Sequence, residues 1–241
     1  MRYGIFSDVH ANWEALTAVI RAFEKEGIDH YFCAGDIVGY GANPQECIDL
    51  IQKLNADCVA GNHDWAVVDK FDTDNFNHAA KQAIFWTKEH VRVGDRDFLK
   101  YLPLIFKNND LILVHGTLPF PQNFEYLLYG DQVQEMFNAM ERSLCFIGHT
   151  HVPQIIFQQE GKVRLWDASD IKIGPQSKYI VNVGSVGQPR DGNPMAAYCI
   201  YDTAQREISI RRVNYAIAAA HQKIIQAGLP RILADRLSEG K

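Results

Sequence analysis

Three short stretches decide the fold: RYGIFSDVH at residues 2–10, YFCAGDIVG at residues 31–39 and CVAGNHD at residues 58–64. Each begins as an apolar run of strand length and passes directly into polar residues or glycine. The intervals between the three stretches are long enough to hold one helix each. Strands separated by helices in this way predict a β-α-β-α-β opening with a parallel sheet.

Both intervals carry helix signals. Apolar residues recur at helical spacing from Leu16 to Phe23, and Gly27 ends that pattern. Residues 43–46, NPQE, supply an N-cap asparagine, a proline in the first turn and a glutamate that would complete a capping box. Two further helices are expected at about 77–90 and 96–101.

The second half of the chain is richer in strands than the first. Seven strands are expected there, at residues 111–114, 144–147, 155–158, 163–166, 179–183, 196–201 and 208–212. One helix at about 131–142 interrupts them, and the tail from residue 215 is helical with a break near residues 228–230. This order predicts a mixed α/β (α+β) architecture of two packed sheets with helices outside. We expect residues 1–241 to form a single domain that ends in a helical tail at about 215–241.

Composition and charge favour some classes of protein over others. With 47% hydrophobic residues, the 241-residue chain can bury a sizeable core. A net charge of -5 offers no basic surface for polymeric nucleic acid or an anionic membrane. No stretch approaches the ~18 apolar residues of a membrane helix, and the amino terminus lacks the apolar core of a signal peptide. We therefore expect a soluble, cytoplasmic protein with buried, reduced cysteines; its oligomeric state stays open.

Polar residues of one chemical kind follow five of the predicted strands. The motifs are Asp8-x-His10, Gly35-Asp36-x-x-Gly39, Gly61-Asn62-His63-Asp64, His115-Gly116 and Gly148-His149-x-His151. Each motif alone also fits an ordinary loop or hairpin, but all five follow apolar runs. Because the carboxyl ends of strands in an α/β sheet line a common crevice, we expect these side chains to meet.

The residue types in these motifs suit divalent metal ions. Carboxylate oxygens and imidazole nitrogens are ligands of borderline cations, and the absence of thiolate from the set allows manganese, iron or zinc, with nickel and cobalt as further options. In Asp8-x-His10 and His149-x-His151, alternate residues of an extended segment would point the same way. The number of donors suits two ions about 3.5–4 Å apart.

With these motifs in this order, the sequence resembles the calcineurin-like metallophosphoesterase superfamily. Residues 182–185, NVGS, resemble a strand end of its small bacterial phosphodiesterase branch. The resemblance implies a four-layer α/β/β/α sandwich of two mixed sheets flanked by helices. It also implies a metal-dependent hydrolase in which a metal-bound hydroxide attacks phosphorus.

The resemblance further implies a role for each motif residue. One ion would be held by Asp8, His10, Asp36 and His151, and a second by Asp36, Asn62, His115 and His149. His63 would be the catalytic residue, as a proton donor to the leaving oxygen or a stabiliser of charge on the phosphoryl group. Asp64 would orient His63 or be a plain surface aspartate. Arg190 would hold a second phosphate through its guanidinium, or be an ordinary loop arginine.

The substrates expected from this pattern are small phosphodiesters, phosphomonoesters or dinucleoside polyphosphates. A Ser/Thr-type protein phosphatase is the first alternative, although Gly39-Tyr40 and Trp65-Ala66 replace the arginines typical of that branch. The second alternative is a non-catalytic scaffold that keeps the same fold, similar to a related retromer subunit. A scaffold would be expected to have lost ligands or the counterpart of His63, and all are present.

Overall fold

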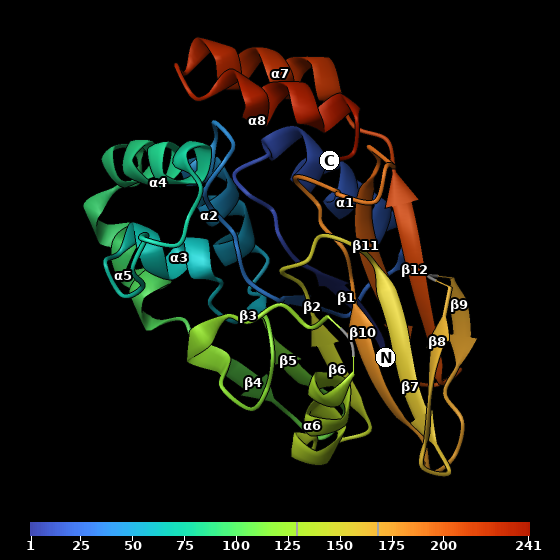
Figure 1. Cartoon of the computed structure of the whole chain (residues 1–241). Helices are drawn as coiled ribbons and strands as arrows, with labels where there is room; N and C mark the ends of the chain where they lie inside the picture. The colour runs from blue at the N-terminus through green and yellow to red at the C-terminus, as the bar shows by residue number, and fades with distance from the viewer. Residues whose placement is uncertain (129, 168) are drawn as a thin grey trace.

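Two six-stranded mixed sheets pack face to face, and helices cover the outer face of each (Figure 1). The computed structural model describes residues 1–128, 130–167 and 169–241. The layers confirm the predicted α/β/β/α sandwich.

The first sheet holds the three amino-terminal strands side by side and parallel. β11 then pairs antiparallel with β1, so the middle of the sheet joins residues far apart in sequence, such as Ile5 and Cys199. Its strand order is β3 (Asp57–Cys58), β2 (His30–Cys33), β1 (Arg2–Phe6), β11 (Ala196–Asp202), β12 (Glu207–Val213) and β9 (Asp170–Lys172).

The second sheet is built from the later half of the chain. β5, β6 and β10 run parallel, and antiparallel strands complete both sides. Its strand order is β4 (Ile105–Lys107), β5 (Ile112–Val114), β6 (Leu144–Ile147), β10 (Lys178–Asn182), β7 (Gln154–Gln159) and β8 (Lys162–Trp166).

Apolar side chains fill the space between the sheets and under the helices. Ile5 and Phe32 of the first sheet share a buried cluster with Leu113 and Phe146 of the second. The outer face of the first sheet packs against α1 (Trp13–Glu26) and α2 (Pro44–Lys53), and that of the second against α6 (Asp131–Ala139). Burying both faces of each sheet supplies the main favourable term for folding.

The remaining helices lie beside these layers. α7 (Ile217–Gln226) and α8 (Arg231–Asp235) pack on each other and share an apolar cluster with α4 (His78–His90). Figure 1 shows α7 and α8 together at the red end of the chain. The other short elements are α5 (Val93–Tyr101), η1 (Pro121–Asn123) and η2 (Arg236–Ser238).

Helix α1 ends and helix α2 begins where the sequence predicts, but the capping hydrogen bonds predicted for α2 do not form. The Asn12 side chain caps α1 by accepting from the backbone N–H of Ala15 at 3.1 Å. At α2 the start is as predicted, but the capping box is wrong: Asn43 accepts no backbone N–H, and its Nδ2 donates to Glu46 Oε1 at 2.8 Å. The two side chains satisfy each other instead of the helix backbone.

Among the α-helices and strands, three escape the sequence patterns because they are short. Two are the strands β4 and β9, of three residues each. The third is α3 (Asn62–Val67), which begins inside the Gly-Asn-His-Asp motif. Six residues give too few turns for a helical period to be recognised.

The five cysteines are buried and unpaired, as expected. Within residues 1–128, 130–167 and 169–241, no helix has the length and apolar character needed to cross a membrane.

Candidate metal centre

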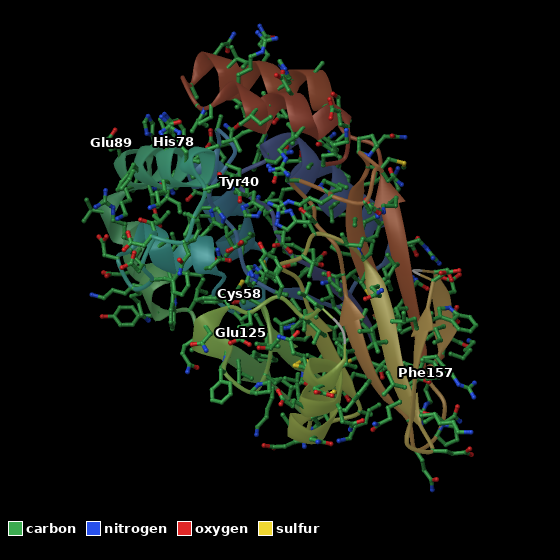
Figure 2. The ribbon with its side chains drawn as sticks, viewed as in Figure 1. Tyr40, Cys58, His78, Glu89, Glu125 and Phe157 are labelled. Atoms are coloured by element: carbon green, nitrogen blue, oxygen red, sulfur yellow. The ribbon has the colours of Figure 1, made fainter. Side chains whose placement is uncertain are left out.

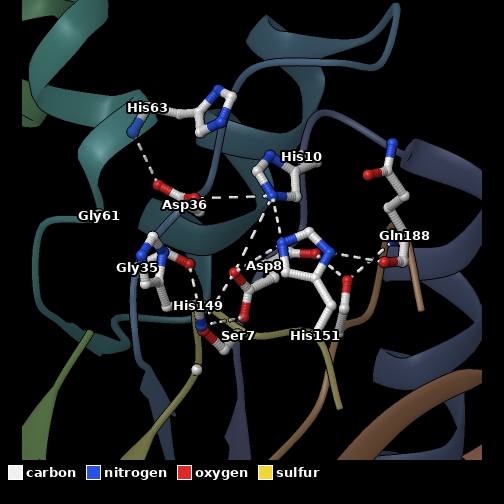
Figure 3. Close-up of polar contacts among 12 residues, drawn as sticks. Ser7, Asp8, His10, Gly35, Asp36, Gly61, His63, His149, His151 and Gln188 are labelled. Atoms are coloured by element: carbon white, nitrogen blue, oxygen red, sulfur yellow. Dashed lines mark hydrogen bonds and ion pairs between the residues drawn. The ribbon is translucent and has the colours of Figure 1, made fainter. Parts of the chain in front are cut away.

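The polar motifs meet at one edge of the sandwich, where strands of both sheets end. Asp8, Asp36 and Asn62 follow β1, β2 and β3 of the first sheet, whereas His115 and His149 follow β5 and β6 of the second. Figure 3 shows His10 and His151 next to Asp8 and Asp36 at this edge. All the predicted site residues except Arg190 are buried: Asp8, His10, Asp36, Asn62, His63, His115, His149 and His151.

One group of donors forms around Asp8. His151 Nε2 lies 3.3 Å from Asp8 Oδ1 and 3.1 Å from His10 Nε2. His10 Nε2 is also 3.6 Å from Asp36 Oδ2, which connects this group to the next. Asp8, His10 and His151 are thus close enough to share one ion.

A second group forms on the other side of Asp36. His115 Nε2 lies 3.3 Å from Asp36 Oδ2, and His149 completes a set that could hold an ion. The same carboxylate oxygen therefore faces both groups, as a bridging ligand would. His10, Asp36 and His63 form a further possible grouping, so proximity alone leaves His63 open as a donor.

Backbone carbonyls fix the orientation of three of the imidazoles. Their Nδ1 atoms lie within hydrogen-bond distance of a carbonyl oxygen: His10 of Val38 at 3.2 Å, His115 of Ala34 at 2.7 Å and His151 of Gln188 at 2.6 Å. A ring that donates its Nδ1–H to a carbonyl has its lone pair on Nε2. Each lone pair then points into the centre, which is the usual arrangement of metal-binding histidines.

The donor set fits divalent cations. In these tautomers, His10 and His151 direct two lone pairs at each other across 3.1 Å, and neither can donate. His149 Nε2 and Asn62 Oδ1 are also buried without a hydrogen-bond partner. Unpaired polar atoms of this kind cost free energy, and a cation between them would supply the missing partner.

Burial and charge shift the pKa values of the centre in opposite directions. Burial lowers the pKa of His149 to about 3 and that of His63 to about 4. Burial acts in the same direction on His115, but the Asp36 carboxylate outweighs it and raises the pKa of His115 to about 9. Conversely, burial alone would raise the pKa of Asp36, and the surrounding imidazoles hold it well below its usual range.

The backbone at the centre is left-handed rather than extended. The φ angles of Asp8, His10, Asp36, His149 and His151 are 53°, 47°, 52°, 69° and 62°. The expected alternation along extended segments is therefore wrong, and tight turns aim the side chains instead. Non-glycine residues in this region cost free energy, and such strain is concentrated at functional sites.

Close backbone approach explains two glycines of the motifs. A Cβ at Gly61 would overlap Asp36 Oδ1, and one at Gly148 would overlap Asp8 Oδ2. The backbone N–H of His63 donates to Asp36 Oδ1 at 2.9 Å. The backbone N–H of His149 donates to Asp8 Oδ2 at 3.0 Å, which links a turn of one sheet to the other.

Asp64 is a buried support of the centre, so the surface interpretation is wrong. Its Oδ1 accepts from the backbone N–H groups of Ile37 and Val38 at 2.9 and 3.2 Å, and its Oδ2 accepts from Gly61 at 3.0 Å. These bonds tie the turn after β2 to the start of α3. Burial, together with the charge of Asp36, raises the pKa of Asp64 to about 7.

A cavity of about 230 Å³ opens beside the centre. Arg190 lines it, and Gln188 Oε1 accepts from the guanidinium at 2.9 Å. A second guanidinium contact reaches the Tyr40 hydroxyl at 3.4 Å. Sequence reasoning selected Arg190 but missed Tyr40, whose only signal was its place directly after the Gly-Asp motif.

The histidines outside the motifs lie away from the centre. His30 pairs with Asp57 at 2.8 Å, and His221 pairs with Asp235 at 3.0 Å. Figure 2 shows His78 on the outer side of α4, whereas Tyr40 lies toward the interior.

Comparison with known proteins gives consistent matches. Residues 1–206 match the model of the calcineurin-like phosphoesterase superfamily domain. The chain is 43% identical to an uncharacterised protein of Methanocaldococcus jannaschii, over 98% of this chain and 97% of that protein. Among solved structures, a metallophosphoesterase from Sphaerobacter thermophilus is 37% identical with a TM-score of 0.87, covering 100% of this chain and 99% of that one. A hypothetical protein from Pyrococcus horikoshii shares the fold at 20% identity and a TM-score of 0.80, covering 100% and 98% of the two chains.

Proposed function

The chain belongs to the calcineurin-like phosphoesterase superfamily, and from this premise we propose that it is a metal-dependent phosphoesterase acting on small phosphate esters or anhydrides. Its substrates are phosphodiesters, phosphomonoesters or dinucleoside polyphosphates. The observation that carries the proposal is the position of Asp36, whose Oδ2 faces both groups of donors.

In this proposal two ions occupy the centre. Asp8, His10, Asp36 and His151 hold one ion, and Asp36, Asn62, His115 and His149 hold the other. Divalent ions bound there would polarise phosphate oxygens, lower the pKa of a water molecule and offset the charge of an in-line displacement.

The protein's own side chains supply orientation and proton control. The carbonyl contacts of His10, His115 and His151 fix their rings before substrate arrives, so no reorganisation is needed at the moment of reaction. His63 lines the same cavity as the donors, and its Nδ1 is buried without a partner. A neutral imidazole N–H can donate a hydrogen bond that stabilises charge on the transferred phosphoryl group, and this is the role we assign to His63.

Arg190 is assigned to the substrate rather than to the fold. Its guanidinium borders the cavity and is held from one side by Gln188 and Tyr40, so donors remain for a phosphate. Nε and Nη2 make these contacts, so the N–H groups of Nη1 are the donors that face a phosphate in this proposal.

The test uses purified protein reconstituted with manganese and assayed with a chromogenic phosphodiester and a chromogenic phosphomonoester. We expect turnover that chelation abolishes, and a roughly 10²- to 10⁴-fold lower kcat in His63→Ala. His78→Ala is the matched control, because His78 is exposed on α4 and should leave activity unchanged. No hydrolysis with manganese, iron, zinc or nickel across a broad phosphate panel would refute the proposal.

A further inference from the structure

One part of the cavity beside the metal centre is aromatic. Donors of the centre form one part of its lining, and the rings of Tyr40, Phe71, Phe76, Phe124 and Tyr126 form another. A site that had to bind only a phosphoryl group would need no such surface, because phosphate is recognised by cations and N–H donors.

Two loops far apart in sequence build this aromatic surface. Phe71 and Phe76 lie between α3 and α4, whereas Phe124 and Tyr126 follow η1. The rings of Phe71 and Phe124 meet at 5.0 Å and 90°, which joins the two loops. The rings therefore form one continuous surface, which we call the aromatic wall.

The aromatic wall directly adjoins the reacting groups. Phe76 meets the His63 ring edge to face at 5.1 Å and 77°. The Tyr126 ring stacks on that of His149 at 4.0 Å and 15°, yet 47% of Tyr126 is exposed. A group attached to a phosphate in the centre would therefore lie against these rings.

The chemistry of the cavity indicates a flat heterocycle. Phe71 and Phe76 are only partly buried, so a flat ring could cover apolar surface that water now contacts. Asn75, Asn77 and Asn123 also line the cavity. Asn77 Oδ1 accepts from the backbone N–H of Ala80 at 3.0 Å, which leaves its amide N–H groups as donors, and Asn75 adds a second amide. A nucleobase presents this combination of an aromatic face and a polar edge.

We propose that this cavity binds the nucleobase of a nucleoside phosphate, stacked against Phe76 and Tyr126, while Arg190 faces the phosphates. The inference rests on the proposed function for the place of the reaction and adds the class of substrate. Simple alkyl phosphates and phosphoserine peptides lack the aromatic group that the wall would cover.

The test measures binding without turnover, by calorimetry on the manganese-loaded protein. The ligands are a phosphonate analogue of a nucleoside monophosphate, whose carbon–phosphorus bond cannot be hydrolysed, and the matching ribose phosphonate without the base. We expect the base to tighten binding roughly 5- to 100-fold, the range of one base stacked on aromatic side chains. Phe76→Ala and Tyr126→Ala should each reduce that factor, which is the ratio of the two affinities measured on the same variant.

Phe85→Ala is the matched control, because Phe85 is 55% exposed on α4 and lies outside the cavity. Equal affinity for the two phosphonates, or a base effect that survives both cavity variants, would overturn the inference. Equally tight binding of phenylphosphonate would overturn the assignment to a nucleobase. Phosphate release from ordinary esters is measured separately, so a failure of the proposed function would be seen as lost hydrolysis with the base effect intact.

Discussion

At the scale of single residues, backbone groups hold the donors of the metal centre. Carbonyl oxygens orient His10, His115 and His151, and the N–H of His63 holds Asp36. Asp64 supports the backbone itself, because its carboxylate accepts hydrogen bonds from three backbone N–H groups. Such outer contacts pre-organise the donors, since a fixed ligand loses less entropy on binding a cation.

Replacing Asp64 tests this support. In Asp64→Asn one amide hydrogen would face the N–H of Gly61, and a buried donor would lose its acceptor. We expect the free energy of unfolding to fall by about 1–3 kcal/mol. Affinity for manganese should fall roughly 10- to 100-fold. Urea unfolding and metal titration measure the two effects.

Asp74→Asn is the control for Asp64→Asn, because the Asp74 side chain is 87% exposed. It should change neither quantity measurably. If Asp64→Asn bound manganese as tightly as the unaltered protein, the supporting role of Asp64 would be wrong.

At the scale of elements, the candidate donors sit where a strand ends and a tight turn begins. β3 passes directly through Gly61 into α3, and this places Asn62 and His63 against the turn after β2. Gly61 has a φ of -97°, so its backbone is open to any residue, and only the closeness of Asp36 requires glycine.

Gly61→Ala should therefore damage the centre while sparing the helix. The added Cβ would push Asp36 away from its position between the two groups of donors. We expect manganese affinity to fall roughly 10- to 100-fold, with unchanged helix content by circular dichroism. Gly94→Ala in α5 is the matched control, since its Cβ meets nothing and should stabilise the protein by about 0.5–1 kcal/mol. Unimpaired metal binding in Gly61→Ala would show that the packing around Asp36 is not decisive.

At the scale of the whole molecule, the centre spans the seam between the two sheets. Asp8 and His10 come from the first sheet, whereas His115, His149 and His151 come from the second. Ions held by both sets would join the sheets at one edge, and the contact between the Tyr3 hydroxyl and Asp110 joins them elsewhere.

Metal loading should consequently stabilise the whole fold. At a manganese concentration about 100 times Kd, the free energy of unfolding should rise by about 2.7 kcal/mol for each occupied site, because the donors are brought together only in the folded chain. Calorimetric unfolding with manganese and with chelator measures this difference. Asp36→Asn should show a much smaller rise, and an equal rise in that variant would place the metal elsewhere.

The Tyr3 contact should make stability depend on alkaline pH. The Tyr3 hydroxyl donates to Asp110 Oδ2 at 2.6 Å, and burial together with this bond raises the pKa of Tyr3 from 10.0 to about 12. Below pH 10 the phenol is neutral in both states, so its full contribution is present. Between about 10 and 12 only the unfolded chain ionises readily, and the contribution is lost.

Comparing Tyr3→Phe with the unaltered protein isolates this effect. The variant should be less stable by about 1–2 kcal/mol at pH 7, and the difference should shrink above pH 10. Urea unfolding across that range measures it. Tyr101→Phe is the control, because Tyr101 is 76% exposed and should show no such difference. A stability difference that stays constant with pH would contradict the assigned role of the hydroxyl.

Much of the fold could be predicted because its signals are local. Apolar runs gave the strands β1 and β6 nearly to the residue, and the spacing from Leu16 to Phe23 gave α1. The motif residues could be selected for the same reason, since strand ends in an α/β sheet share a crevice. Short elements such as α3 were missed because a few residues carry no period.

The sequence by itself determined which residues converge, because alternating strands and helices fix the edge at which strand ends meet. Tertiary structure alone decided how they face one another: the left-handed turns at Asp8 and Asp36, the burial of Asp64, and the aromatic wall of Phe76 and Tyr126. Each of these depends on contacts between segments that lie tens of residues apart. Such long-range contacts cannot be predicted from the spacing of residues along the sequence, because they form only when the two sheets pack together.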